Sequence, residues 1–293
     1  MTDPFARVKD AIADTLGALL PQQSDIAQPM VDAMRHAVLG GGKRMRPLMA
    51  CAACEAFSGS FKAALPAACG LEFIHAYSLI HDDLPAMDDD ELRHGQAATH
   101  IAFGEANAIL AGDSLHSLAF QALAEAPHLS HAAKLRCISL LSTAAGWPGM
   151  AGGQCLDIAA EGQQLTLARL EALHSAKTGA LIEASLVIGA YCAEVEPDNP
   201  RLTLLRTFGQ RIGLAFQIVD DILDDTESSE TLGKPAGSDQ ALHKNTFPKL
   251  MGLAGAQQRA EALLAESLAL LKEADLATEL LKGLAERSVK RNH

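Results

Sequence analysis

The sequence predicts an all-α fold, and three observations support that prediction. Ala and Leu are far more frequent than Val, Ile and Thr, and β-branched residues lose more side-chain freedom in a helix than Ala or Leu. Apolar residues recur with helical periodicity through most of the 293 residues, and glycine and proline separate the periodic segments. No stretch alternates apolar and polar residues as a half-buried strand would.

The periodicity divides the chain into ten long helical segments and a short one at the C-terminus. Pro66 suits the first turn of its helix, whereas Pro85 is expected to end the helix that carries Asp82. The connections are short and no Ser-, Pro- or Gly-rich linker divides the chain, so one large domain is predicted over residues 1–293. The predicted helices cover 5–19, 26–39, 46–58, 66–82, 105–125, 131–146, 166–191, 200–225, 239–252 and 256–274.

Composition also limits where the protein works. The N-terminus is charged and no apolar stretch follows it, so no signal peptide is expected. No uncharged apolar run approaches the ~18 residues of a membrane span, so no stable membrane insertion is expected. Cys51 and Cys54 form a CxxC without a second pair or a flanking His. The six cysteines are therefore predicted to be buried, reduced thiols, which places the protein in the cytoplasm.

The net charge of −12 is concentrated in two short windows. Residues 82–91 contain six carboxylates, residues 220–230 contain another six, and neither window contains Lys or Arg. These twelve acids account for the whole imbalance, because the remaining acidic residues equal the 24 Lys and Arg in number. A nucleic-acid binder would carry clustered positive charge, so no nucleic-acid partner is expected.

Each acidic window contains a pair of adjacent aspartates and a further one, at the end of an apolar helix. Asp220 and Asp224 are four apart and share a helix face with Gln217, whereas Asp82 and Asp88 need the chain break at Pro85 to come together. Carboxylates this close repel one another unless a cation lies among them. One such cluster is typical of a solvated helix end, but two predict Mg²⁺, with Mn²⁺ as the alternative, and a phosphate-bearing substrate between them. The candidate ligands are Asp82, Asp83, Asp88, Asp220, Asp221 and Asp224.

Basic residues supply candidate phosphate contacts. The glycines at 40–42 adjoin Lys43 and Arg46, a combination that suits an anion cradle. The segment is not a P-loop, because Ala37 and Arg44 break that motif at two positions. Further isolated cations, each of which alone would pass for a surface residue, are Lys177, Lys234 and Lys244.

Together these segments resemble the short-chain trans-prenyl diphosphate synthases, and among them the bacterial-type farnesyl diphosphate synthases. The resemblance extends over nearly the whole chain, in the order and at the spacing of the family. The matching segments are GGGKRMRP (40–47), LEFIHAYSLIHDDLPAMDDDELR-G (71–95), HIAFGEANAILAGDSL (100–115), GMAGGQCLDI (149–158), HSAKTGAL (174–181), GLAFQIVDDILDD (213–225) and TLGKPAG (231–237).

The resemblance implies an isoprenoid synthase fold, in which one helical bundle surrounds a central cavity, usually in a homodimer. It implies prenyl transfer, the head-to-tail 1′-4 condensation of isopentenyl diphosphate with dimethylallyl or geranyl diphosphate to give farnesyl diphosphate. Mg²⁺ held by Asp82, Asp88 and Asp220 would assist ionisation of the allylic diphosphate, with the other three aspartates as ligands or as supports of ligands. The departing diphosphate would accept the proton.

The same resemblance assigns roles to individual positions. The allylic diphosphate would be held by Lys177, Lys234 and Arg93. The isopentenyl diphosphate would be held by Lys43, Arg46 and His75. Thr178 and Gln217 match positions near the developing cation, and Lys244 matches a cation that closes over the diphosphates. Tyr77 matches the position whose bulk limits product length and indicates C15 or shorter, a role compatible with that of an ordinary core aromatic.

The chain departs from the family at His94, where relatives carry a second Arg that contacts the isopentenyl diphosphate. Arg is a permanent, fork-shaped cation, whereas His is largely neutral near pH 7. Loss of a charge-assisted contact costs on the order of 1.5–3 kcal/mol. We therefore predict weak isopentenyl diphosphate binding that improves below neutral pH.

Four alternatives to an active prenyltransferase stay open at this point. His94 is the only support for a catalytically weakened homologue or a non-catalytic partner subunit. A terpene cyclase of the same fold generally has a different second motif. A metal phosphohydrolase using His81 and Asp82 as an HD pair would need further His ligands and leaves the second cluster unexplained. A purely structural helical bundle would show no effect of Mg²⁺ on its stability.

Overall fold

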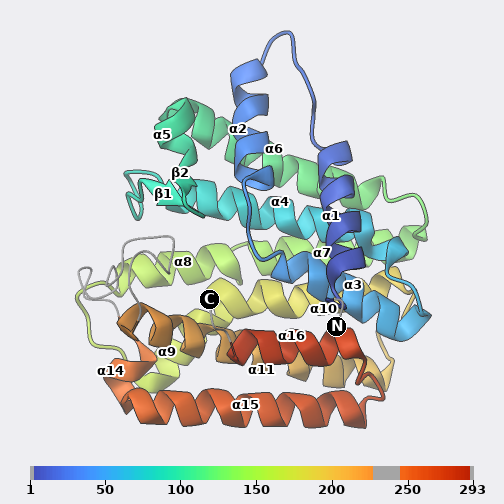
Figure 1. Ribbon diagram of the computed structural model, residues 1–293, viewed down its shortest axis with the longest axis vertical. Helices are drawn as coiled ribbons and strands as arrows, with labels where there is room; N and C mark the ends of the chain where they lie inside the picture. The colour runs from blue at the N-terminus through green and yellow to red at the C-terminus, as the bar shows by residue number, and fades with distance from the viewer. Residues whose placement is uncertain (1–2, 227–244, 291–293) are drawn as a thin grey trace.

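Helices make up nearly all of the regular structure in the computed structural model, which describes residues 3–226 and 245–290 (Figure 1). Most of the long helices run side by side in one bundle, across the longest axis of the molecule, whereas α1 and α2 run along that axis (Figure 1). The helices of the N-terminal half are α1 (Ala6–Leu19), α2 (Gln28–Leu39), α3 (Met45–Ser58), the 3₁₀ turn η1 (Lys62–Ala64), α4 (Leu65–Asp82), α5 (Thr99–Phe103), α6 (Glu105–Ala124) and α7 (His131–Ala145). Those that follow are α8 (Met150–Ala159), α9 (Leu167–His174), the π turn η2 (Ser175–Gly179), α10 (Ala180–Cys192), α11 (Pro200–Thr226), α14 (Phe247–Met251), α15 (Leu253–Glu273) and α16 (Glu279–Val289).

Helix boundaries follow from local chemistry. The side chains of Ser130, Thr166 and Thr278 each accept a backbone N–H at the start of their helices, α7, α9 and α16. Pro66 lies in the first turn of α4, where its missing N–H has no helical partner to lose. Gly59 ends α3 in the left-handed conformation.

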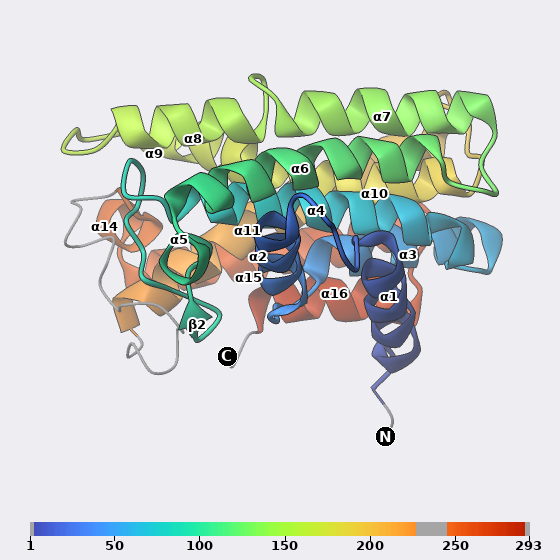
Figure 2. The same ribbon diagram turned by 90° about the horizontal axis from the view of Figure 1, so that it is seen from above.

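The centre of the bundle is α10, in which every residue from Ala184 to Cys192 is buried. It packs against α3, α7 and α11, while α4 packs along α6 and α11 along α15. A side chain at Gly189 would collide with the backbone of Ala50, so glycine allows α10 and α3 to approach closely. Seen from above, α7 and α8 run along one side of the molecule beside α6 (Figure 2).

A two-stranded hairpin follows α4, and the sequence analysis did not predict it. Strands β1 (Leu92–Arg93) and β2 (Gln96–Ala97) pair antiparallel, with Arg93 opposite Gln96. His94 and Gly95 form the turn with φ of 53° and 75°, the conformation that two-residue hairpin loops favour. Strands of two residues are too short to show an alternating pattern, which is why periodicity missed them.

The predicted all-α class is confirmed, with further local differences besides the hairpin. The helix predicted over 166–191 is interrupted by the π turn η2, and α5 and α8 were not predicted. Residues 239–244 of the helix predicted over 239–252 lie outside the described residues, and α14 begins only at Phe247. All six cysteines are free, but Cys155 is exposed rather than buried. One helical stretch, Lys62–Asp82, is long and apolar enough to span a membrane by composition, yet 61% of its apolar window is buried inside the protein, as in a core helix.

Candidate active site

The first aspartate motif lies where α4 ends. Asp82 is the last residue of the helix, and the chain then turns through Pro85. The backbone N–H of Asp88 donates to the carbonyl of Asp82 at 2.8 Å, so the turn folds Asp88 back onto the helix end. The structure therefore brings together the two aspartates that are six residues apart in sequence.

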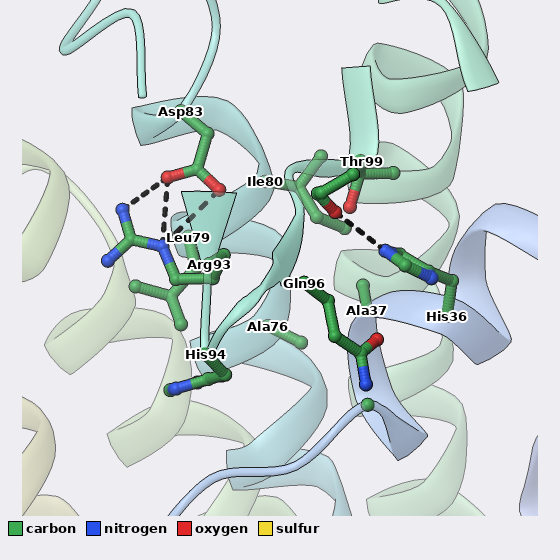
Figure 3. A pocket seen from close by; sticks show the side chains of 12 residues that line it. His36, Ala37, Ala76, Leu79, Ile80, Asp83, Arg93, His94, Gln96 and Thr99 are labelled. Atoms are coloured by element: carbon green, nitrogen blue, oxygen red, sulfur yellow. Dashed lines mark hydrogen bonds and ion pairs between the residues drawn. The ribbon is translucent and has the colours of Figure 1, made fainter. Parts of the chain in front are cut away.

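Asp83, the middle member of this motif, is committed to Arg93 on β1. Nε of Arg93 donates to both carboxylate oxygens, at 3.0 and 3.3 Å, and its Nη2 donates to the same carboxylate. Nη2 also lies 3.1 Å from Asp90, and Asp83 is only 2% exposed. Figure 3 shows this pair facing each other beside a small pocket between α2, α4 and the hairpin. Among the described residues, none of the second motif lines that pocket, so it is not a space between the two motifs.

The second aspartate motif occupies the last turns of α11. Asp221 is 5% exposed, and its Oδ2 accepts the backbone N–H of Phe247 at 2.9 Å. The Phe247 ring stacks on His174, with centroids 5.5 Å apart. Asp221 therefore joins α11 to the start of α14. Asp224 is also buried, whereas Asp220 is half-buried.

Lys177 lies in the π turn η2, which packs against α11, the helix that carries the second motif. A π turn displaces side chains from the regular helical register, and such turns recur at functional sites. The Nζ of Lys177 is 2.6 Å from Oδ2 of Asp157 on α8, and the charge of Lys177 also acts on Asp82. Gly153 makes this arrangement possible, because a Cβ there would overlap the backbone of Lys177. The neighbouring Thr178 is 9% exposed.

The pKa of Asp82 indicates whether the site fits a divalent cation. The pKa of Asp82 is raised to about 6: burial is the largest cause, Asp88 and Asp83 act in the same direction, and Lys177 and Arg93 oppose them. An ionised Asp82 is therefore costly in the protein alone, and a bound cation would relieve that cost. Oxygen donors of this kind suit Mg²⁺. Within residues 3–226 and 245–290 no three acidic, His or Cys side chains converge enough to hold a metal by themselves, so substrate phosphates and water would complete the coordination.

The predicted isopentenyl diphosphate residues gather around the loop that precedes α3. Gly41 and Gly42 have φ of 129° and 108°, a conformation that favours glycine, and Lys43 follows them on the surface. Arg46, in the first turn of α3, has a buried Nε and feels the charge of Asp220 on α11. This electrostatic interaction couples the residue that follows the glycine loop to the second aspartate motif.

Two histidines complete this set of predicted isopentenyl diphosphate residues. Burial lowers the pKa of His75 well below its usual value, and Arg46 and His94 lower it further. Burial also lowers the pKa of His94, and Arg93, Arg44 and Lys43 add to that shift. Both imidazoles are therefore neutral near pH 7 in the protein without substrate.

Comparison with known proteins decides which family these motifs represent. Residues 27–282 match the family model described as polyprenyl synthetase. The chain belongs to that family. It is 46% identical over 269 residues to the farnesyl diphosphate synthase of Escherichia coli K12, covering 90% of each chain. It is 48% identical over 238 residues to the large subunit 1 of a heterodimeric geranylgeranyl pyrophosphate synthase of Arabidopsis thaliana, covering 79% of this chain and 64% of the relative.

A solved structure of the family shows the same fold. The geranyltransferase of Helicobacter pylori, complexed with magnesium and isoprenyl diphosphate, superposes with a TM-score of 0.85 at 33% identity, over 99% of this chain and 98% of the other. The predicted isoprenoid synthase fold and the predicted transferase class, prenyltransferase, are thereby confirmed. Membership of the polyprenyl synthetase family also excludes the phosphohydrolase and structural-bundle alternatives.

The structure places most, but not all, of the residues predicted from the family motifs. Tyr77 is half-buried on α4, with its ring edge-on to His81 at 5.5 Å and to His116 of α6 at 5.1 Å. Gln217 is half-buried one turn before Asp221 on α11. Lys234 and Lys244 lie outside the described residues.

Sequence reasoning missed several polar partners in this polyprenyl synthetase. Asp157, which pairs with Lys177, and His174, which stacks on Phe247, both lie in segments that matched the family, yet neither received a role. Glu72 is buried on α4 and pairs with Arg44. A charged residue in an otherwise apolar helix was the one available signal for Glu72, because an acid in such a position is rarely buried unless it is paired.

Proposed function

We propose that this protein is a farnesyl diphosphate synthase, which joins isopentenyl diphosphate head to tail to dimethylallyl and then geranyl diphosphate. One observation carries the proposal: the charge of Lys177 acts on Asp82, and Asp220 acts on Arg46. Each aspartate motif therefore lies beside a cation, as two diphosphate substrates would require. The E. coli relative of that name, similar over 90% of both chains, supports it.

On the allylic side, Lys177 and Arg93 bind the diphosphate beside the first motif. Asp157 and Asp83 hold these two cations in place by ion pairs. Lys234 joins this set on the sequence evidence. Asp82, Asp88 and Asp220, together with substrate phosphates, would hold Mg²⁺, or Mn²⁺ in its place, which would supply Lewis-acid stabilisation of the leaving diphosphate. Asp221 and Asp224 complete the second motif.

On the acceptor side, Lys43, Arg46, His75 and His94 bind the isopentenyl diphosphate, and Lys244 is a further diphosphate-binding cation on the basis of the family motif. Thr178 and Gln217 present oxygen dipoles to the allylic cation. The isopentenyl double bond attacks that cation, a C–C bond forms, and the departed diphosphate takes the proton lost from the isopentenyl unit.

Tyr77 limits the product to C15. Identity alone does not settle product length, because a geranylgeranyl synthase subunit is 48% identical to this chain. The Tyr77 ring is about one and a half helical turns before Asp82 and is backed by His116, so a growing chain that descends along α4 meets two aromatic rings. Side-chain bulk at that depth stops elongation.

The protein acts as a cytoplasmic homodimer without stable membrane insertion, and residues 1–293 form one polyprenyl synthetase domain. Exposed apolar residues support the dimer. Ile101 on α5 and Ile109 and Leu110 on α6 are 53%, 42% and 51% exposed, and α5 packs against α6, so two helices in contact expose apolar side chains that a second copy would cover.

The experiment that tests the function is product analysis with labelled isopentenyl diphosphate, Mg²⁺, and dimethylallyl or geranyl diphosphate. We expect a C15 diphosphate that disappears with EDTA and in Asp82→Ala. Absence of any elongation, even at high isopentenyl diphosphate, would overturn the proposal in favour of a weakened homologue or partner subunit. In that case His94→Arg is the variant that tests whether a single contact accounts for the loss.

A further inference from the structure

Arg44 stands between two residues assigned to isopentenyl diphosphate, yet its own guanidinium is committed to the protein. Nη1 donates to Oε1 of Glu72 on α4 at 2.5 Å, and Nη2 donates to the carbonyl of Val38 in the last turn of α2 at 2.5 Å. One side chain therefore joins the end of α2, the start of α3 and the middle of α4. No role in substrate binding had been assigned to Arg44 or Glu72 from the sequence.

The backbone at Arg44 shows why these contacts matter. Its φ is 52°, in the left-handed region that side chains other than glycine rarely adopt, and it follows two glycines that also have positive φ. A residue persists in that conformation only when its surroundings hold it there. Two charge-assisted hydrogen bonds to two other helices provide that hold. The direction in which Lys43 and Arg46 leave the chain therefore depends on Arg44.

Glu72 is the residue that holds the Arg44 guanidinium on α4. It is 4% exposed, and it lies one helical turn before His75 on the same helix. Its carboxylate faces more than Arg44: burial lowers the pKa of both Arg46 and His94, and the Glu72 charge opposes the shift in each case. A buried acid beneath a group of cations has two conceivable effects on an anion bound above them. It weakens binding through its charge, or strengthens it by fixing the cations in place.

We propose that Arg44 and Glu72 are positioning residues for isopentenyl diphosphate: through Val38 they lock the loop 40–44 so that Lys43 and Arg46 converge on the diphosphate. This inference rests on the proposed function, which assigns that loop to isopentenyl diphosphate. Neither residue touches the substrate. Their effect on catalysis passes through the geometry of the loop, and the allylic diphosphate, held by Lys177 and Arg93, is not affected.

The test is steady-state kinetics of Glu72→Ala, Glu72→Gln, Arg44→Ala and Arg44→Lys, with each substrate varied in turn. For Glu72→Ala we expect the KM for isopentenyl diphosphate to rise about tenfold, or about 1.4 kcal/mol, with KM for geranyl diphosphate and kcat little changed. Glu72→Gln keeps an oxygen that accepts the Arg44 N–H and should fall between the wild type and Glu72→Ala. Arg44→Lys keeps the charge but cannot bond Val38 and Glu72 with two nitrogens at once, so its KM should rise as well.

A matched control is the Arg206–Glu183 ion pair, which joins α11 to α10 with 2.9 Å between Nη1 and Oε1. Glu183→Gln and Arg206→Lys should change the melting temperature without a change in KM for isopentenyl diphosphate. The double variant Arg44→Ala/Glu72→Ala should have a KM for isopentenyl diphosphate no higher than that of either single variant, because each single change already breaks the Arg44–Glu72 ion pair.

Three outcomes would overturn the inference. A lower KM in Glu72→Ala would show that Glu72 acts through its charge. An equal rise in KM for both substrates, or a loss of melting temperature alone, would show a purely structural pair. Failure of the proposed function is a separate result, because the wild type would then make no product. Calorimetric titration of isopentenyl diphosphate into the wild type and into Glu72→Ala would still compare the affinities of the two proteins.

Discussion

Lys177 and Asp157 form an ion pair across two helical segments, with 2.6 Å between Nζ and Oδ2. The pair is mostly shielded from water, and it fixes a lysine whose charge reaches the first aspartate motif. The π turn that carries Lys177 and the glycine that lets α8 approach it serve the same contact. The position of this cation is therefore set by α8, a helix outside both aspartate motifs.

Asp157→Ala should weaken the use of the allylic substrate, because Lys177 loses the partner that orients it. A charge-assisted contact of this kind is worth on the order of 1.5 kcal/mol, or about tenfold in kcat/KM for geranyl diphosphate. Initial rates with geranyl diphosphate varied at saturating isopentenyl diphosphate measure it. Glu161→Gln, an exposed acid just beyond α8, is the control that should behave as the wild type. An unchanged kcat/KM in Asp157→Ala would show that Lys177 needs no orientation.

Gly153→Ala should lower both stability and activity more than the addition of one methyl group suggests. The added Cβ overlaps the backbone nitrogen and Cα of Lys177, which no rotamer change relieves. Overpacking of this kind costs about 1–3 kcal/mol and would displace the π turn. We expect a lower melting temperature and at least a tenfold loss of kcat, an effect of the size that misplacing a catalytic group produces. Gly17→Ala is the matched control, because that glycine has open space around it and Ala is the better helix former there, so stability should rise by about 0.5–1 kcal/mol. Equal activity in both variants would contradict the prediction.

The fold and the acidic half of the site could be predicted because their signals are local. Helical periodicity and the break at Pro85 lie within a few residues of what they determine, and so do the aspartate pairs. Helix α8 escaped prediction because its sequence, MAGGQCLDIA, contains two adjacent glycines that disfavour a helix in isolation. Packing against the π turn stabilises it instead, a tertiary contact that periodicity does not show.

The partners of the site residues could not be predicted from the pattern for a similar reason. Asp157 lies 20 residues from Lys177, Phe247 lies 26 from Asp221, and Glu72 lies 28 from Arg44. Nothing in the local sequence says that these residues meet. Asp221 illustrates the consequence: sequence pattern presents it as one more carboxylate, whereas in the fold its Oδ2 also accepts a buried backbone N–H.

His94 makes binding of isopentenyl diphosphate depend on pH. Burial and then Arg93, Arg44 and Lys43 lower its pKa, and Glu72 opposes them. His94 is therefore neutral at pH 7. A diphosphate bound beside it favours the protonated form, and binding therefore takes up a proton. We expect the KM for isopentenyl diphosphate to fall as the pH is lowered from about 7.5 to about 6, around the usual His pKa of about 6.5.

The variants His94→Arg and His94→Gln separate charge from shape at this position. Arg is charged throughout that range, so His94→Arg should lower the KM at pH 7.5 and remove its pH dependence. Gln stays neutral, so its KM should remain high at both ends of the range. The prediction fails if the wild type and His94→Gln show the same pH profile, because another group would then take up the proton.

Asp82 should destabilise the metal-free protein at neutral pH. Burial raises its pKa from 3.8 to about 6, so the folded state binds a proton more tightly than the unfolded state does. That contribution favours folding at low pH and is lost as the pH rises through about 6. Asp82→Asn removes the desolvated charge and should stabilise the metal-free protein at about pH 7.5 by about 1–2 kcal/mol, and by less at about pH 4.5, even as it abolishes prenyl transfer.

Melting curves of the metal-free wild type and Asp82→Asn at the two pH values measure this difference. Asp89→Asn is the control, because Asp89 is exposed in the same turn and Asn tolerates its left-handed φ of 54°. Its stability should follow that of the wild type at both pH values. A less stable Asp82→Asn at pH 7.5 would mean that Lys177 compensates the charge fully without a metal. A more stable Asp82→Asn at pH 7.5 would mean that the folded wild type carries an uncompensated carboxylate at this position. A cation bound during catalysis would then relieve that cost.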